Sequence, residues 1–266
     1  MPTALIVLAA GQGTRMNSDL PKVLHELGGA PLFAHALASG RALTPARTVL
    51  VTGHGAKDVA KAAHGIDSDI RIAEQSEQHG TAHAVAQAQA ALQGFEGDTV
   101  VLYGDTPFIR AETLLAMQDA RAAHDIVVLG FHAAAAGRYG RLVLNGQSLE
   151  RIVEFKDASP EERAISLCNS GVICASTDLL FDLVNSVNNQ NASGEYYLTD
   201  IVGIARAREQ PGAHKQIKRI DVTGFRDRIG KGDVTSPEIG QRFDSAVTPH
   251  EDPARIAGLP AINLGQ

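Results

Sequence analysis

Cysteine is scarce in this chain of 266 residues, and tryptophan is absent. The two cysteines, Cys168 and Cys174, are too few for a disulfide framework in a chain of this length, and their spacing is not that of a CxxC pair. We therefore expect two reduced thiols in the protein interior.

An excess of positive charge is also missing, because 30 acidic residues outnumber 24 Lys and Arg and leave a formal net charge of −6. This balance disfavours nucleic acid or a membrane surface as a partner. Residues 1–10 lack a charged beginning, and their apolar run is too short to cross a bilayer. We predict a cytoplasmic protein with no nucleic-acid and no membrane partner.

Several common site motifs are absent from the sequence. It has no GxxxxGK(S/T) loop and no G-x-S-x-G elbow, and Met16 occupies the third position of a GxGxxG dinucleotide fingerprint. Without HxH or HExxH spacing, His25, His54, His79 and His83 indicate surface or capping histidines rather than a zinc site. These absences disfavour P-loop NTPases and zinc enzymes, and they weaken the case for an NAD-binding oxidoreductase.

Apolar runs of strand length alternate with helical patterns in the first half of the chain. The runs lie at residues 4–8, 48–51, 98–103 and 126–131, and they lack polar alternation, as expected for strands buried on both faces. Helical patterns lie at residues 31–43, 56–63, 82–92 and 111–122, the first with Pro31 at its first helical position. This βαβαβαβαβ order predicts an α/β fold with a Rossmann-like, doubly wound sheet.

The second half of the chain changes character. Residues 141–145 and 149–155 flank Gly146 and predict an antiparallel hairpin, residues 170–174 predict a further strand, and residues 178–187 and 199–208 predict helices. The sheet is therefore expected to be mixed, with a small antiparallel addition. After residue 210 the pattern weakens. We expect one domain at residues 1–229 and an irregular tail at 230–266, which contains four prolines.

The most informative segment directly follows the first predicted strand. It reads LAAGQGTRM at residues 8–16, with Pro21 and Lys22 shortly after. Glycines after a strand let the backbone approach a ligand and point N–H groups toward it, while Arg15 and Lys22 add cations that suit a triphosphate. The residues expected to contact the nucleotide here are Leu8, Ala9, Ala10, Gly11 and Gly13.

A carboxylate follows another predicted strand, in the segment Tyr103-Gly104-Asp105. Open α/β sheets place ligand contacts at the carboxyl ends of their strands. Mg²⁺ prefers oxygen ligands and usually takes one or two carboxylates together with substrate phosphates. Asp105 is therefore the candidate Mg²⁺ ligand, although a turn residue before Pro107 is the simpler interpretation.

These segments resemble the sugar nucleotidyltransferases, whose first loop reads L-A-A-G-x-G-T-R-M with a P-K shortly after. Among them, the chain is most similar to the pyrophosphorylase domains of bacterial N-acetylglucosamine-1-phosphate uridylyltransferases. The resemblance covers about residues 4–205. Beyond the first loop it rests on Gln75 with residues 80–84, and on residues 103–107, 139–141, 152–154, 169–171 and 194–200.

The resemblance implies a fold of the nucleotide-diphospho-sugar transferase type and an Mg²⁺-dependent reaction of UTP with N-acetylglucosamine 1-phosphate that forms UDP-N-acetylglucosamine and pyrophosphate. It implies that Arg15, Lys22 and Asp105 are catalytic. It further implies that Gln75, Gly80 and Thr81 recognise uracil, that Tyr103 and Gly104 line the site, and that Gly140, Glu154, Asn169 and Thr199 hold the amino sugar and its phosphate. Thr81 also suits a helix N-cap.

The sequence departs from the family pattern in two places. Where the family has an Asn that acts as a second Mg²⁺ ligand, the ungapped match places Arg226, and Asp227 is the candidate replacement. The hexapeptide repeats of the bifunctional members, which carry acetyltransferase activity, are not found in these 266 residues. We expect no acetyltransferase activity from this chain.

Two alternatives stay open at this point. One is a related nucleotidyltransferase with another sugar or base. The other is a catalytically impaired sugar-nucleotide binding protein, which Arg226 in place of Asn would favour.

Overall fold

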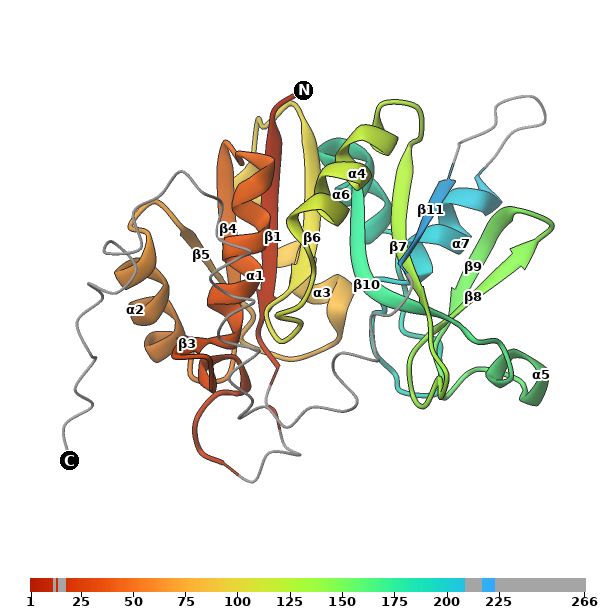
Figure 1. The fold of residues 1–266 in the computed structure, drawn as a ribbon, viewed down its shortest axis with the longest axis horizontal. Coiled ribbons are helices and arrows are strands. Elements are labelled where there is room, and N and C mark those ends of the chain that lie inside the picture. Colours follow the sequence, from red (N-terminus) through yellow and green to blue (C-terminus); the bar gives the residue numbers. More distant parts are fainter. Residues whose placement is uncertain (12, 14–17, 209–216, 223–266) are drawn as a thin grey trace. The chain divides into compact units, whose positions relative to one another are not determined.

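The computed structural model describes residues 1–11, 13, 18–208 and 217–222 (Figure 1). All of them belong to one compact unit that spans Met1–Lys231. The tail predicted at residues 230–266 lies outside the described residues.

Among the described residues the main sheet has nine strands, with the order β11-β7-β10-β6-β1-β4-β5 and with β8 and β9 attached beside β10. Strands β5, β4, β1 and β6 are mutually parallel. The strands are β1 (Thr3–Ala9), β4 (Arg47–Thr52), β5 (Arg71–Glu74), β6 (Asp98–Tyr103), β7 (Ile126–His132), β8 (Arg141–Asn145), β9 (Ser148–Val153), β10 (Leu167–Ser176) and β11 (Ile217–Val222). A separate short pair joins β2 (Glu26–Leu27) and β3 (Ala30–Pro31).

Two hydrophobic cores cover the two faces of this sheet. In β1 the side chains of residues 4, 6 and 8 enter one core, and those of residues 5, 7 and 9 enter the other. Successive side chains of a strand point to opposite faces, so a strand between two cores has to be apolar throughout. This accounts for the unbroken apolar run in the sequence of β1.

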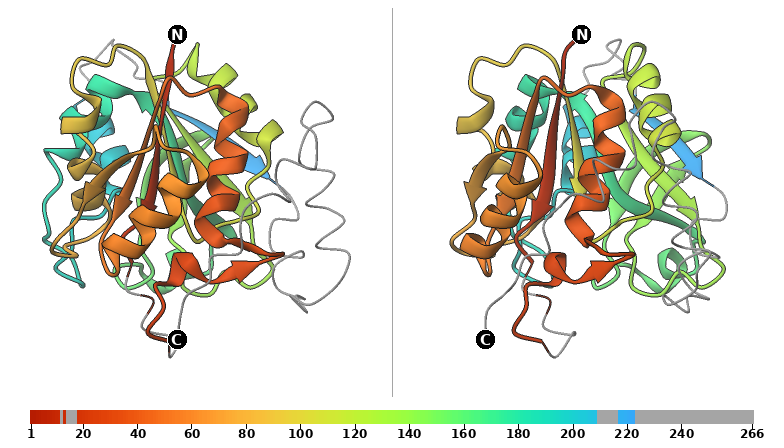
Figure 2. Two further views of the ribbon diagram at one scale, coloured as in Figure 1. Left: turned by 90° about the vertical axis from the view of Figure 1, so that its left-hand side faces the viewer. Right: turned by 60° about the vertical axis from the view of Figure 1, so that its left-hand side comes forward.

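Helices pack on both faces (Figure 1, Figure 2). One core contains residues of α1 (Leu32–Gly40), α2 (Ala56–Ile66) and α4 (Ala111–Arg121). The other contains residues of α3 (Thr81–Gln87), α6 (Thr177–Val184) and α7 (Asp200–Ala207). The shorter helices are η2 (Lys22–Leu24), η3 (Arg41–Leu43), η4 (Ala90–Leu92) and α5 (Pro160–Arg163). The predicted doubly wound mixed sheet is thereby confirmed.

Strand β10 runs antiparallel between β6 and β7, in the interior of the sheet. Its register pairs Ile173 with Val101, and the pairing with β7 shifts between Asn169 and Ile173. Because β10 is reversed, its first residues lie where the parallel strands end. The antiparallel half of the chain therefore reaches the same edge as β1 and β6.

Most predicted elements are confirmed within one to three residues, and the differences have local causes. The pattern at residues 82–92 is not one helix, because α3 ends at Gln87 and η4 follows separately. The prediction that Pro31 is the first helical residue was wrong, since Pro31 pairs in β3 and precedes α1. The short edge strand β5 was not predicted, and neither was β11 beyond residue 210.

Candidate active site

The carboxyl ends of β1 and β6 meet at one edge of the sheet. Leu8 pairs with Tyr103, and the Gly104 N–H donates to the Leu8 carbonyl oxygen over 2.8 Å. Ala9 and Ala10 are buried, and the chain emerges at the exposed Gly11. The segment that leaves β1 and the segment that leaves β6 therefore start side by side.

Lys22 and Asp105 form an ion pair at this edge, with 2.5 Å between Nζ and Oδ2. Lys22 begins η2, which is anchored by the buried Val23. Gly13 lies directly against Lys22: a Cβ at Gly13 would be 2.7 Å from the Lys22 Cβ, and its φ is +62°. Only glycine fits such a contact with a positive φ. The structure thus brings Gly13, Lys22 and Asp105 together.

Tyr103 connects this edge with the antiparallel half of the chain. Its ring lies over Gly171 of β10, where a Cβ would be 2.5 Å from Cε2, and its hydroxyl is hydrogen-bonded to the Thr81 side chain. Burial raises the pKa of Tyr103, and the negative charges of Glu154 and Asp105 raise it further against the opposing effect of the Thr81 bond. Tyr103 is therefore a neutral phenol that is close enough to both carboxylates to be influenced by their charges.

Gln75 and Gly80 lie beyond the end of β5. The Gln75 N–H donates to the Thr52 carbonyl at the end of β4 over 2.7 Å, and the side chain is buried. Its Nε2 donates to the Gly80 carbonyl over 3.1 Å and lies 2.9 Å from Nδ1 of His83. The predicted base-recognition residues thus contact one another.

Thr81 is not a helix N-cap, which corrects one sequence interpretation. Gly80 is the N-cap of α3, and the Thr81 hydroxyl instead accepts a hydrogen bond from the Leu198 N–H over 2.9 Å. The Ala82 N–H donates to the Tyr196 carbonyl, and the Tyr196 N–H donates to the His79 carbonyl. These bonds fasten the start of α3 to the segment before α7.

The four residues predicted to hold the sugar also form one group. The Asn169 N–H donates to the Gly140 carbonyl over 2.9 Å, and Gly140 lies against the Glu154 carboxylate. The Thr199 hydroxyl donates to Glu154 Oε1 over 3.1 Å. Asn169 Oδ1 accepts from the Gly171 N–H, and no acceptor among the described residues engages Nδ2, so this donor is left for a ligand.

Negative charge accumulates around this group. Burial raises the pKa of Glu154, the Thr199 bond lowers it, and nearby carboxylates including Asp200 and Asp157 raise it. Burial and the charge of Asp157 raise the pKa of Asp200 to about 6. Carboxyl groups with raised pKa values that gather beside a strand edge are typical of functional sites.

Two predicted site residues, Arg15 and Asp227, lie outside the described residues, and so does Arg226. Another residue was misjudged from the sequence: His83, expected at the surface or in a cap, is partly buried against Gln75. The only sign in the sequence was that His83 lies within residues 80–84, one of the segments that resemble the family. No spacing pattern identifies a histidine that contacts an amide side chain.

The described residues contain no group of three or more His, Cys, Asp or Glu side chains that could hold a metal ion by themselves. Asp105 offers one carboxylate beside the glycine loop. That is a fitting donor set for Mg²⁺, which completes its coordination with water and substrate phosphates.

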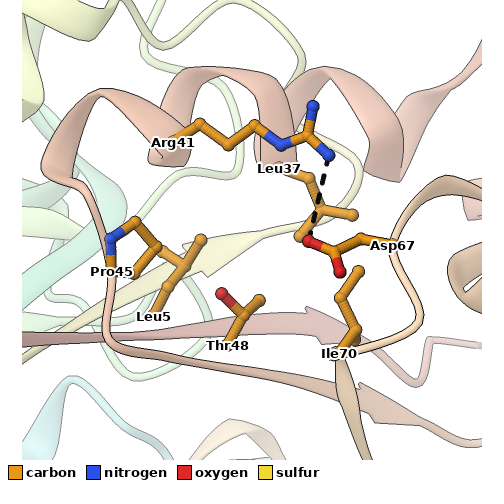
Figure 3. A pocket seen from close by; sticks show the side chains of 7 residues that line it. All are labelled: Leu5, Leu37, Arg41, Pro45, Thr48, Asp67 and Ile70. Atoms are coloured by element: carbon orange, nitrogen blue, oxygen red, sulfur yellow. Dashed lines mark ion pairs between the residues drawn. The ribbon is translucent and has the colours of Figure 1, made fainter.

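A separate small pocket lies at the opposite end of the strands (Figure 3). Its volume is about 150 Å³, and Leu5, Leu37 and Ile70 line it beneath a long ion pair of 3.9 Å between Arg41 and Asp67. The positive charge of Arg41 is paired with Asp67, so this pocket does not resemble a phosphate site. No helix in the described ranges has the length and apolarity to cross a membrane.

Comparison with solved structures supports the fold. A UDP-glucose pyrophosphorylase complexed with UDP-glucose superposes with a TM-score of 0.66 at 16% identity, covering 83% of this chain and 91% of the other. A putative glucose-1-phosphate thymidylyltransferase from Bacillus anthracis also gives a TM-score of 0.66, at 18% identity, covering 94% of this chain and 97% of the other.

Relatives in sequence are far more similar. The bifunctional protein GlmU of Cereibacter sphaeroides is 64% identical over 205 residues, which are 77% of this chain and 45% of that protein. The bifunctional protein GlmU of Roseobacter denitrificans is 57% identical over 228 residues, 86% of this chain and 51% of that protein. The chain thus spans about half the length of the curated relatives it matches. The model of the MobA-like NTP transferase domain matches residues 5–170, well over half of the chain, and the chain belongs to that family.

Proposed function

We propose that this chain transfers the uridylyl group of UTP to N-acetylglucosamine 1-phosphate, forming UDP-N-acetylglucosamine and pyrophosphate. The observation that carries the proposal is the contact between Lys22 and Asp105 beside Gly13. It supplies a cation for phosphate oxygens and a carboxylate for a divalent ion at the end of two parallel strands.

In the proposed reaction an oxygen of the sugar phosphate attacks the α-phosphorus of UTP. A P–O bond forms to the sugar phosphate, the bond to the bridging oxygen of pyrophosphate breaks, and pyrophosphate leaves with that electron pair. No side-chain nucleophile takes part. The protein contributes by aligning the two phosphates and by stabilising the charge that develops on them.

Within this scheme Lys22 leaves its ion pair and donates to phosphate oxygens, and the loop at Gly11 and Gly13 supplies backbone N–H groups. Arg15, which the sequence places in the same loop, is proposed as a second cation. Bound Mg²⁺, with Asp105 as its protein ligand, would neutralise phosphate charge around the reacting phosphorus.

On the acceptor side, Glu154 and Asn169 offer complementary groups. A carboxylate accepts from sugar hydroxyls, and the Asn169 Nδ2 group is a donor that suits the oxygen of an N-acetyl group. The hydrogen bond from Thr199 holds the Glu154 carboxylate in place. This pairing supports an N-acetylated amino sugar over glucose.

A pyrophosphate-release assay tests the proposal. UTP, CTP, dTTP and GTP are each combined with the 1-phosphates of N-acetylglucosamine, glucosamine and glucose, with and without Mg²⁺. We expect the highest kcat/KM for UTP with N-acetylglucosamine 1-phosphate, and turnover only with the metal. Absence of pyrophosphate release from every pair would leave a binding protein, and a different best pair would reassign the substrates.

A further inference from the structure

The amide of Gln75 makes both of its side-chain contacts with the protein through its nitrogen. Nε2 lies 3.1 Å from the Gly80 carbonyl oxygen and 2.9 Å from Nδ1 of His83. A backbone carbonyl can only accept, so the opposite orientation of the amide would set two oxygens against each other. The Gly80 carbonyl therefore favours the orientation with the NH₂ group pointing inward.

The second contact constrains His83. Nδ1 accepts the remaining Gln75 hydrogen only if it carries no proton, which requires a neutral imidazole with its hydrogen on Nε2. A protonated or Nδ1–H ring would place a donor against a donor. Such a ring would favour the Gln75 amide turned by 180°, with its oxygen toward His83, whereas the Gly80 carbonyl favours the NH₂ group on that side.

With both amide hydrogens engaged, the Gln75 Oε1 atom is left for a ligand. No donor from the described residues bonds to it. An oxygen in this role accepts from the N3–H of uracil, but it opposes the unprotonated N3 of cytosine. A rotated amide would present NH₂ instead and would reverse this preference.

Gln75 lies close enough to the glycine loop for this to matter. Gly53, after β4, separates the loop from the segment that follows Gln75. A Cβ on Gly53 would lie 2.7 Å from the Ala10 carbonyl oxygen and 2.9 Å from Nε2 of Gln78. Nε2 of Gln78 also donates to the Gln75 backbone carbonyl over 3.3 Å. The segment that begins at Gln75 therefore borders the backbone that is proposed to hold the triphosphate of the same nucleotide.

We infer that His83 is a positioning residue that makes the site select uracil over cytosine, by holding the Gln75 amide with its oxygen toward the base. The inference rests on the proposed function, because it takes a pyrimidine nucleotide as the ligand of this site.

The tautomer of His83 is measurable without turnover. In full-length protein labelled with ¹⁵N-histidine, long-range ¹H–¹⁵N correlations distinguish Nε2–H from Nδ1–H rings, and the spectrum of His83→Asn assigns the signal. We expect the neutral Nε2–H form at pH 8. A neutral ring with its hydrogen on Nδ1 would overturn the inference.

Base selection is the second readout. His83→Lys replaces the acceptor with a cationic donor, and we expect the UTP-to-CTP ratio of kcat/KM to fall by about tenfold, the scale of one misdirected hydrogen bond. His83→Asn retains an acceptor and should stay within about threefold of the wild type. His64→Lys is the matched control, since the His64 ring also makes a partly buried hydrogen bond, to the Ile70 carbonyl, but at the opposite end of the strands.

An unchanged ratio in His83→Lys, with UTP still turned over, would refute the role of His83 and leave the proposed function standing. A wild type that fails to use UTP would instead remove the proposed function. In that case the tautomer measurement still decides whether His83 accepts from Gln75.

Discussion

At the scale of single residues, the Lys22–Asp105 pair has consequences for turnover rather than for folding. Its side chains are 37% and 30% exposed, so solvent screens their attraction. Ion pairs that are exposed to this degree contribute about 0–1 kcal/mol to stability. A charge placed at a reacting phosphate contributes considerably more to the stabilisation of the transition state.

Replacement of Asp105 by Asn tests this difference. We expect kcat/KM to fall by about 100-fold or more, because the proposed metal ligand loses its charge. The free energy of unfolding should change by less than about 1 kcal/mol. Pyrophosphate release and urea unfolding measure the two effects. Asp67→Asn, in the distant pair with Arg41, is the control and should leave both nearly unchanged.

Asp200 makes stability depend on pH. Its pKa is raised to about 6 from the ordinary value of 3.8 for an aspartic acid, so the folded state holds its proton more tightly than the unfolded state. Stability from this group is present below about pH 4 and is lost as the pH rises through 6. Asp200→Asn should therefore raise the free energy of unfolding at pH 7.5 by about 1 kcal/mol, after allowance for solvent screening.

Urea unfolding at pH 7.5 and at pH 4 checks this prediction. The gain from Asp200→Asn should shrink toward zero as the pH approaches 4. An equal gain at both pH values would mean that the carboxyl group is not the cause.

Residue identity alone indicated Lys22 and Asp105, because loop glycines, cations and a strand-end carboxylate are local features of the sequence. It did not indicate His83. The contact between His83 and Gln75 forms only when β5 and α3 bring their ends together. Nothing in the local sequence of His83, which lies between two alanines of a helix, indicates that it contacts Gln75.

At the scale of elements, Gly171 permits the close approach of β10 to the Tyr103 ring. Its φ is +91°, and a Cβ would lie 2.5 Å from the ring. Gly171→Ala should lower the free energy of unfolding by about 2–3 kcal/mol, through backbone strain and displacement of Tyr103.

Gly146, in the β8–β9 turn, provides the comparison. Its φ is +60°, but a Cβ there would meet nothing within 4 Å. Gly146→Ala should therefore cost only the backbone strain, about 1 kcal/mol. Urea unfolding of both variants measures the difference, and equal losses would show that Tyr103 adds nothing to the effect of φ.

Prediction of elements succeeded where the physical cause is local. Strands β1, β4, β6 and β7 are apolar on both faces, so their composition identifies them. Strand β5 carries charge at both ends and lies at the sheet edge, which leaves a weak signal. An antiparallel addition was predicted, but the position of β10 between β6 and β7 was not, because strand order depends on partners far apart in the chain.

At the scale of the whole molecule, the two cysteines report on the integrity of the sheet. Both belong to β10 and are buried. Burial raises the pKa of Cys174 to about 12, with a contribution from the charge of Asp98 against that of Arg121. A protonated, inaccessible thiol does not react with alkylating reagents.

Native protein should accordingly resist iodoacetamide at pH 8, and both thiols should become labelled once urea unfolds the chain. Mass spectrometry of the labelled peptides distinguishes the two positions. Labelling at the rate of a free thiol in native conditions would mean that β10 detaches without global unfolding.

The antiparallel direction of β10 has a consequence for where the binding residues of the two substrates lie in the sequence. The nucleotide half of the proposed site comes from residues 8–105, and the acceptor half comes from residues 140–199. The antiparallel strand β10 pairs with β6 and so brings the second stretch to the sheet edge that the first stretch forms. In a chain organised in this way, substitutions within residues 140–199 can change the sugar specificity while the residues that bind the triphosphate stay the same.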